Sequence, residues 1–114
     1  MSHKIYHNPR CSKSRQTLQI MKDNSMSFEV VEYLKEIPSK EELSQLLIEL
    51  NIPAENLIRK GEAAYKENFK GKDLSQEEWI DAMIAYPKLI ERPIVTNGKQ
   101  AIIGRPPEKV LELI

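Results

Sequence analysis

The chain has 114 residues, of which 40% are hydrophobic and 30% charged, a composition typical of one globular domain. The charges of its 17 basic and 17 acidic residues cancel, so no overall positive field attracts nucleic acid. A small local site for an anion is still compatible with this balance. No stretch is apolar over the length of a signal peptide or a membrane span. We therefore expect a single domain over residues 1–114, with neither nucleic acid nor membrane as a partner.

The first third of the chain alternates between strand and helix patterns. Residues 4–7 form a short extended run, which the turn-forming pair Asn8-Pro9 ends. A helical pattern follows over residues 12–23, and residues 28–34 are rich in β-branched and aromatic side chains, which predicts a second strand. Because a helix joins the two strands, we expect them to be parallel, with a right-handed crossover.

Two helices in the middle of the chain begin with a capping-box sequence. Ser39 and Glu42 precede four leucines that share one helix face between residues 43 and 50. Ser75 and Glu78 begin a second helix, which ends before residue 87.

Two further segments lie between these helices. Residues 54–59 predict a short helix, whereas residues 66–72 are polar and charged. We interpret the second segment as an exposed connection, because its lysines favour a solvated loop over a nucleic-acid patch.

The last third of the chain predicts a hairpin and a closing helix. Asn97-Gly98 separates the apolar runs 93–96 and 100–103 and favours a turn, because both residues tolerate positive φ. A final helix is expected over residues 106–114. This order predicts an α/β fold, namely a four-stranded mixed sheet flanked by helices with a helical insertion in the middle, which is the thioredoxin-like plan.

The only cysteine, Cys11, lies between the first predicted strand and the first predicted helix. A thiolate there would face the unpaired N–H groups of the first helical turn and the positive end of the helix dipole. Arg10, Lys13 and Arg15 add positive charge, and a protonated His7 would add more. Such surroundings lower a cysteine pKa to about 3.5–7.5. The same amides can hold an oxyanion, so we predict a reactive cysteine rather than a structural one.

The residues at fixed distances from Cys11 in the sequence distinguish between several kinds of cysteine chemistry. A dithiol redox motif needs a second cysteine at the position of Ser14, and a tyrosine-phosphatase loop needs an arginine at the position of Thr17. A metal site needs more soft ligands than one cysteine with His3 and His7 provides. The remaining option is an enzyme with one thiol, which takes its second thiol from another molecule in a reducing, cytoplasmic compartment.

The chain resembles the glutaredoxin-coupled arsenate reductases, a family with the thioredoxin fold, over nearly its whole length. Each matching segment is weakly specific by itself, but their order and spacing together are specific. The segments are Tyr6-His7-Asn8-Pro9 ahead of Cys11, Ser14-Arg15 after it, Leu57-Ile58-Arg59-Lys60, Glu91-Arg92-Pro93-Ile94-Val95 and Gly104-Arg105-Pro106.

This resemblance implies a role for each matched residue. Cys11 is the catalytic nucleophile, and His7 helps to tune its thiolate. Pro93 is a candidate cis-proline facing the active site. The oxyanion-binding residues that the resemblance implies are Arg59, Arg92 and Arg105.

The resemblance also implies the reaction. In that family the cysteine attacks arsenate, glutathione attacks the resulting arsenic adduct, and glutaredoxin removes the glutathione so that arsenite is released. The expected protein is thus a cytoplasmic oxidoreductase of arsenical resistance, with no bound cofactor, with glutathione as co-substrate and with glutaredoxin as partner.

The residues around the cysteine differ from those of the well-studied reductases. Arg10 stands where a small residue is usual, and Ser12 and Lys13 replace a glycine and a small polar residue. The added positive charge would tighten oxyanion binding. Alternatively, the Arg10 side chain fills space that the substrate needs. Two alternatives to arsenate reduction are a glutathione-linked thiol reductase of another oxyanion or mixed disulfide, and a redox regulator that binds RNA polymerase. Ser14 disfavours the regulator, because those proteins generally switch through a pair of cysteines.

Overall fold

The structure is a computed structural model that describes residues 3–114. The contacts within the chain divide it into two compact units. The described residues of the sheet unit are 3–36 and 92–114, and the helical unit comprises residues 37–91. The expectation of a single domain over residues 1–114 stays a prediction.

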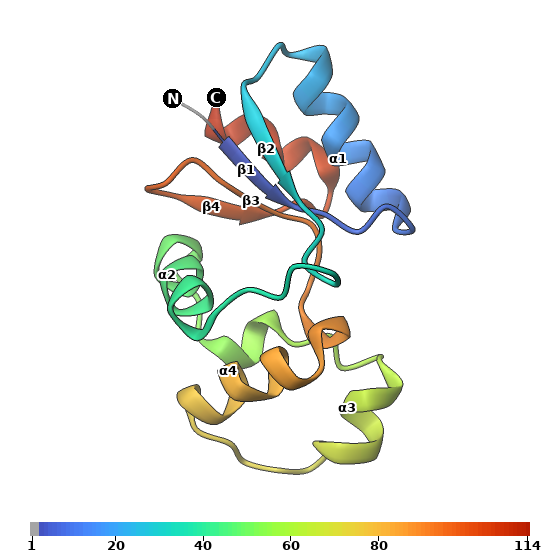
Figure 1. Cartoon of the computed structure of the whole chain (residues 1–114), viewed down its shortest axis with the longest axis vertical. Helices are drawn as coiled ribbons and strands as arrows, with labels where there is room; N and C mark the ends of the chain where they lie inside the picture. The colour runs from blue at the N-terminus through green and yellow to red at the C-terminus, as the bar shows by residue number, and fades with distance from the viewer. Residues whose placement is uncertain (1–2) are drawn as a thin grey trace. The chain divides into compact units, whose positions relative to one another are not determined.

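The sheet unit is a four-stranded mixed sheet with helices, as the sequence predicts (Figure 1). The strand order is β2-β1-β3-β4, with β1 and β2 parallel and the other two pairs antiparallel. Its elements are β1 (His3–Tyr6), α1 (Ser12–Asp23), β2 (Phe28–Val31), β3 (Ile94–Thr96), β4 (Ala101–Ile103) and the 3-10 helix η3 (Pro107–Leu113).

The second strand is shorter than the predicted range 28–34. The last register pair of β1 and β2 joins Tyr6 to Val31, and the His7 amide then donates to the Val31 carbonyl at 2.8 Å. Beyond that point the chain turns, because the amides of Lys35 and Glu36 both donate to the carbonyl of Glu32 at 2.9 Å. The prediction is therefore wrong for residues 32–34, where no neighbouring strand continues the ladder.

One face of the sheet is covered by α1 and η3. The core there is formed by Ile5 from β1, Val95 from β3, Met21 from α1, and Val110 and Leu113 from η3. Each of these five side chains is at most 7% exposed. Full burial of a side chain of this size contributes about 1.5–3 kcal/mol, so this cluster fixes the helix that begins at the cysteine against the sheet.

The predicted hairpin is present between β3 and β4. Asn97 closes the turn with its side-chain Oδ1, which accepts from the amides of Lys99 at 2.9 Å and Gln100 at 2.8 Å. Gly98 has a φ of 93°, a conformation that a glycine adopts without a steric cost.

Both predicted capping boxes are present in the helical unit. The Ser39 hydroxyl accepts from the Glu42 amide at 3.1 Å, and the Ser75 hydroxyl accepts from the Glu78 amide at 3.2 Å. The elements of this unit are α2 (Lys40–Leu50), the 3-10 helix η1 (Ala54–Leu57), α3 (Ala63–Asn68), α4 (Gln76–Ala85) and the 3-10 helix η2 (Pro87–Leu89).

The prediction of a plain connection over residues 66–72 is wrong, because α3 extends into it. The reason is aromatic packing that the polar composition conceals. The rings of Tyr65 and Phe69 lie 6.3 and 6.0 Å from that of Trp79, and Phe69 also meets Tyr86 edge-on at 5.7 Å. One turn of helix brings Tyr65 and Phe69 to the same face, where α4 supplies their partners.

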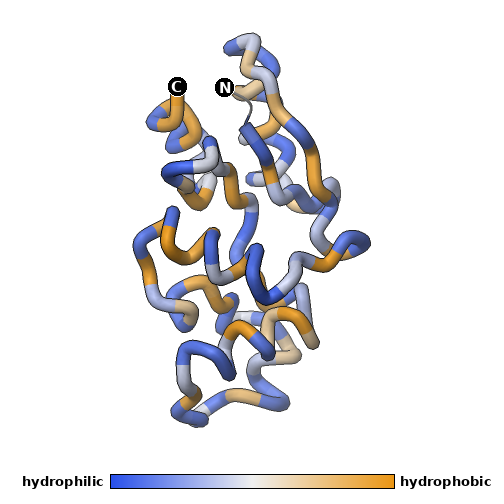
Figure 2. The backbone as a smooth tube through the Cα atoms, turned by 60° about the vertical axis from the view of Figure 1, so that its left-hand side comes forward, coloured by the Kyte–Doolittle hydropathy of each residue, from blue (hydrophilic) through white to orange (hydrophobic). Residues whose placement is uncertain are grey.

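Hydrophobic and hydrophilic residues alternate at short intervals along the backbone of residues 3–114 (Figure 2). Within residues 3–114, no helix combines the length and the apolar character that crossing a membrane requires.

Candidate active site around Cys11

Cys11 is the N-cap residue of α1, as its place in the sequence predicts. Its backbone is extended, with φ −94° and ψ 123°, and its amide donates to the Asn8 carbonyl at 3.0 Å. The Asn8 side chain accepts from the Arg10 amide at 3.0 Å, which holds the turn between strand and helix. The sulfur is therefore presented at the start of a helix from a turn that hydrogen bonds fix on both sides.

The pKa of the Cys11 thiol is lowered from its ordinary value. Partial burial acts against this, since it disfavours the charged form and is the largest single influence. It is outweighed by the backbone N–H groups of Ser14 and Lys13 together with the Arg92 guanidinium, all of which stabilise the thiolate. The predicted helix-start effect is thus present, but the main cationic side chain is Arg92 rather than a sequence neighbour of the cysteine.

The structure brings Arg92 and Arg105 to the sulfur. Nη2 of Arg105 lies 3.7 Å from Cys11 Sγ, and its Nε donates to the Arg92 carbonyl at 2.8 Å. The Gly104 amide donates to the Pro93 carbonyl at 2.9 Å, which ties the two arginine-bearing segments together. The predicted cis bond at Arg92-Pro93 is present, and the Arg105-Pro106 bond is also cis. Two guanidinium groups and a thiolate therefore share one site, an arrangement suited to a tetrahedral anion.

His7 is part of a buried hydrogen-bond network rather than a direct neighbour of the sulfur. Its Nδ1 lies 2.6 Å from the Ser14 hydroxyl, which also accepts from the Asn8 amide at 3.0 Å. Burial lowers the pKa of His7, and Arg15 and Lys22 lower it further, while Glu32 opposes them. His7 is thus mainly neutral at pH 7, and it adds positive charge only when a lower pH protonates it. Ser14, whose amide faces the thiolate, therefore lies between His7 and Cys11.

Arg59 belongs to the helical unit. Its amide donates to the Leu89 carbonyl at 2.7 Å, and its guanidinium forms ion pairs with Glu62 at 3.5 Å and Glu91 at 3.6 Å. The side chain is 24% exposed. Its role in holding an oxyanion stays a prediction.

The sequence assigns no role at the site to three residues, namely Asn8, Ser14 and Tyr33, although Asn8 and Ser14 lie in segments that carry the resemblance. The sequence identifies Ser14 as the place of a missing second cysteine and as part of a matching segment, but it does not predict the contact between its hydroxyl and His7. Tyr33 lies within the range expected to be strand, and nothing in its spacing separates it from a core residue. The structure places it in the turn after β2, with its side chain 1% exposed.

Arg10 and Arg15 are exposed beside the cysteine. Nη1 of Arg15 donates to the Pro9 carbonyl at 2.9 Å, so this side chain braces the turn. Among residues 3–114, no three His, Cys, Asp or Glu side chains are grouped as metal ligands.

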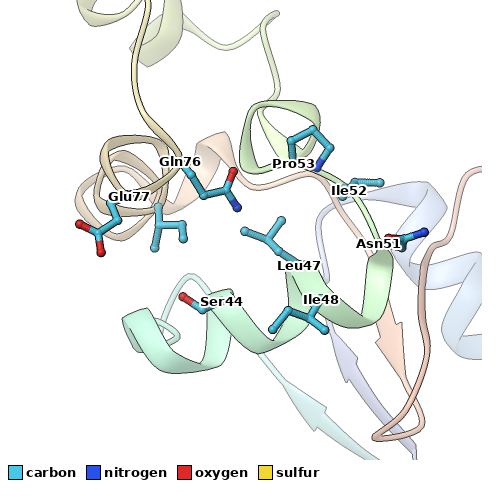
Figure 3. Close-up of a pocket in the computed structure, with 9 residues that line it drawn as sticks. Ser44, Leu47, Ile48, Asn51, Ile52, Pro53, Gln76 and Glu77 are labelled. Atoms are coloured by element: carbon cyan, nitrogen blue, oxygen red, sulfur yellow. The ribbon is translucent and has the colours of Figure 1, made fainter.

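A separate pocket of about 580 Å³ lies within the helical unit. Figure 3 shows Leu47 from α2 pointing toward Gln76 at the start of α4. Gln76 is already engaged, since its Oε1 accepts from the Ala54 amide at 2.9 Å. The lining is mostly apolar and amide side chains and contains no cysteine, histidine or cationic side chain, whereas Cys11 lies beside two arginines.

Comparisons with known proteins agree with the resemblance of the sequence. The model of the ArsC family matches residues 6–113. The chain is 43% identical to an arsenate reductase of Haemophilus influenzae over the full length of both, and 50% identical to the uncharacterised protein YfgD of Escherichia coli (strain K12), over 97% of this chain and 95% of YfgD. The solved structure of an arsenate reductase from Vibrio cholerae has a TM-score of 0.94 and 47% identity, covering 100% of this chain and 98% of that one.

Proposed function

This chain belongs to the ArsC family, and from that membership we propose that it reduces arsenate to arsenite through the Cys11 thiolate, with glutathione and glutaredoxin as electron donors. The observation that carries the proposal is the position of the sulfur at the start of α1, 3.7 Å from the Arg105 guanidinium and with a lowered pKa. A thiolate is the nucleophilic form, and the cations beside it attract an anionic substrate.

The first step is attack of the thiolate on arsenic. A sulfur–arsenic bond forms, and one arsenate oxygen leaves as water after protonation. Charge on the remaining oxygens is stabilised by donors that are already in place, namely Arg92 and Arg105 and, by the family resemblance, Arg59. Such preplaced donors act most strongly in the transition state, which is where they accelerate the reaction.

The electrons come from two thiols supplied by other molecules. Glutathione displaces a second oxygen as water and becomes bound to arsenic through its sulfur. A glutaredoxin thiolate then attacks that sulfur, so that the electron pair of the sulfur–arsenic bond stays on arsenic and reduces As(V) to As(III). The glutaredoxin and glutathione sulfurs are oxidised in this step and leave together as a mixed disulfide. Water releases arsenite from Cys11 and restores the thiol.

This scheme defines the surroundings that the protein needs. The chain requires no bound cofactor, because glutathione and glutaredoxin supply both electrons. The expected compartment is the cytoplasm, where thiols of this kind are kept reduced. His7 acts as a positioning residue, since its bond to Ser14 holds the first turn of α1 against the thiolate.

The test is arsenate-dependent oxidation of NADPH in the presence of glutathione, glutaredoxin and glutathione reductase, with wild type beside Cys11→Ser. We expect turnover in the wild type and none in the variant, with both proteins folded by circular dichroism. Turnover in the variant would contradict the role of Cys11.

An inactive wild type with a low thiol pKa would shift the proposal to the glutathione-linked reduction of another oxyanion or of a mixed disulfide. Alkylation with iodoacetamide over a pH series measures that pKa independently of the substrate. A pull-down with RNA polymerase under reducing and oxidising conditions tests the remaining alternative, the redox regulator.

A further inference from the structure

Tyr33 has a buried hydroxyl group without a well-formed hydrogen bond. The side chain is 1% exposed, and its hydroxyl oxygen is fully covered. Among residues 3–114, no donor or acceptor meets this oxygen with hydrogen-bond geometry. A buried hydroxyl without a partner destabilises a folded protein, so each such group in a native structure needs an explanation.

The surroundings of this hydroxyl are those of the Cys11 site. The Asn8 side chain and the Arg92 guanidinium lie close enough to lower the pKa of Tyr33 by hydrogen bonding to its oxygen, although neither reaches that oxygen with full hydrogen-bond geometry. The Cys11 thiolate is near enough to raise the pKa. Burial is the largest influence, and the pKa rises to about 12. The phenol therefore keeps its proton at every pH at which the thiol reacts, and it can donate a hydrogen bond without adding charge.

Arg92 connects the two groups, because the same guanidinium also stabilises the Cys11 thiolate. An anion held by Arg92 at the sulfur would therefore lie beside the Tyr33 hydroxyl. The hydroxyl is covered in the free protein, so contact with the anion requires a neighbouring side chain to move aside.

We infer that Tyr33 is an oxyanion-binding residue, which donates its O–H to an oxygen of the anion held by Arg92 at Cys11. This inference rests on the proposed function, and it adds a neutral donor to the arginines that the family resemblance identifies. A hydrogen bond from a hydroxyl to an anionic oxygen is short and strong. It forms only when the ligand is present, so the hydroxyl that is unsatisfied in the free protein becomes satisfied in the complex.

The test compares wild type with Tyr33→Phe, which removes the oxygen and keeps the ring. Tyr86→Phe is the matched control, because it removes the same atom from a 40% exposed ring that packs on Phe69 in the helical unit. Three quantities are measured for each protein: kcat/KM for arsenate in the coupled assay, protection of Cys11 from iodoacetamide by arsenate and by phosphate, and the melting temperature.

For Tyr33→Phe we expect kcat/KM and anion protection to fall roughly ten- to hundredfold, the range for one hydrogen bond to a charged group. The pH profile of Cys11 alkylation without anion should be unchanged, and the melting temperature equal or higher, because an unpaired buried hydroxyl is lost. A lower melting temperature with unchanged kcat/KM and protection would overturn the inference and make the hydroxyl structural.

The remaining outcomes separate this inference from the proposed function. Unchanged turnover and protection in Tyr33→Phe, with an active wild type, would overturn the role of Tyr33 and leave arsenate reduction intact. An inactive wild type that arsenate or phosphate still protects, with weaker protection in Tyr33→Phe, would support the role of Tyr33 and contradict arsenate turnover. A wild type that neither anion protects would overturn the role of Tyr33.

Discussion

Ser14 shows how one residue links three parts of the site. Its hydroxyl contacts both the His7 ring and the Asn8 amide, and its own amide faces the Cys11 thiolate. The sequence predicts the cysteine and its position at a helix start, because both follow from a strand, a turn and a helix in succession. It does not predict that Arg92 is the main cationic side chain at Cys11, because these two residues, 81 positions apart in the chain, meet only through the antiparallel pairing of β1 with β3.

The first prediction concerns the cation that stabilises the thiolate. In Arg92→Met the pH midpoint of iodoacetamide alkylation of Cys11 should move upward. Burial still disfavours the thiolate, and the guanidinium that stabilises the thiolate is lost. Arg10→Met is the matched control, since it removes an exposed arginine next to the cysteine in sequence. A larger shift in Arg10→Met than in Arg92→Met would show that proximity along the chain decides the pKa.

The second prediction concerns the shape of the Arg92 side chain. Arg92→Lys keeps the charge but cannot present two N–H groups to two oxygens of one anion. We expect kcat/KM for arsenate to fall about ten- to hundredfold, the effect of losing a hydrogen bond to a charged group. The coupled assay measures this change, and a variant equal to wild type would remove Arg92 from the binding site.

At the scale of elements, Gly104 allows a close approach between α1 and the segments that carry the arginines. A Cβ at this position would lie 2.6 Å from Thr17 Oγ1 on α1 and 2.8 Å from Pro93 Cγ ahead of β3. Thr17 is fully buried, and its hydroxyl donates to the Lys13 carbonyl at 2.8 Å, so it has little room to move. A glycine is required here because of space and not because of its backbone conformation.

The third prediction follows from that contact. Gly104→Ala should lower the free energy of unfolding by about 1–3 kcal/mol, the usual cost of overpacking. Gly61→Ala is the control, since nothing lies within 4 Å of a Cβ at that position, and it should change stability by at most about 0.5 kcal/mol. Chemical denaturation measures both variants, and equal stabilities would show that the neighbours of Gly104 relax.

A helix was predictable from the sequence where its own residues determine where it begins and ends. Helix α1 has the bounds that the sequence indicates, and the two capping boxes begin α2 and α4. Helix α3 was not predictable in the same way, because its stability depends on aromatic partners that α4 supplies. The C-terminal segment is a 3-10 helix where the sequence predicts a helix without specifying its type.

At the scale of the whole molecule, the order of elements and the family resemblance were sufficient to predict the thioredoxin-like sheet. The sheet unit is discontinuous in sequence, because the helical unit is inserted between β2 and β3. Of the expected oxyanion-binding arginines, Arg92 and Arg105 belong to the sheet unit and Arg59 to the helical unit. A pattern in the sequence can identify the three arginines, but it contains no distances, and only the folded sheet brings two of them to Cys11.

The fourth prediction concerns the stability of the folded chain against pH. The folded pKa of His7 lies below its unfolded value of 6.5, so the unfolded chain binds the proton more readily. The contribution of His7 is fully present above pH 6.5 and is lost as the pH falls toward the folded pKa. His7→Asn, which cannot be protonated, should therefore lose less stability than wild type between pH 7 and about 5. Parallel curves of unfolding free energy against pH would contradict this prediction.

The position of Cys11 has a cost for the helix that it begins. The Cys11 sulfur makes no hydrogen bond with the geometry of a helix cap, although the first-turn amides stabilise its thiolate form. A serine, threonine or aspartate at an N-cap accepts a hydrogen bond from the first-turn amides through a side-chain oxygen. The Cys11→Ser control is thus expected to be inactive and yet more stable, by about 0.5–1 kcal/mol. Position 11 is therefore a place where selection for stability and selection for activity act in opposite directions. A lineage that no longer needed the thiol would gain stability by exchanging it for an oxygen-bearing side chain.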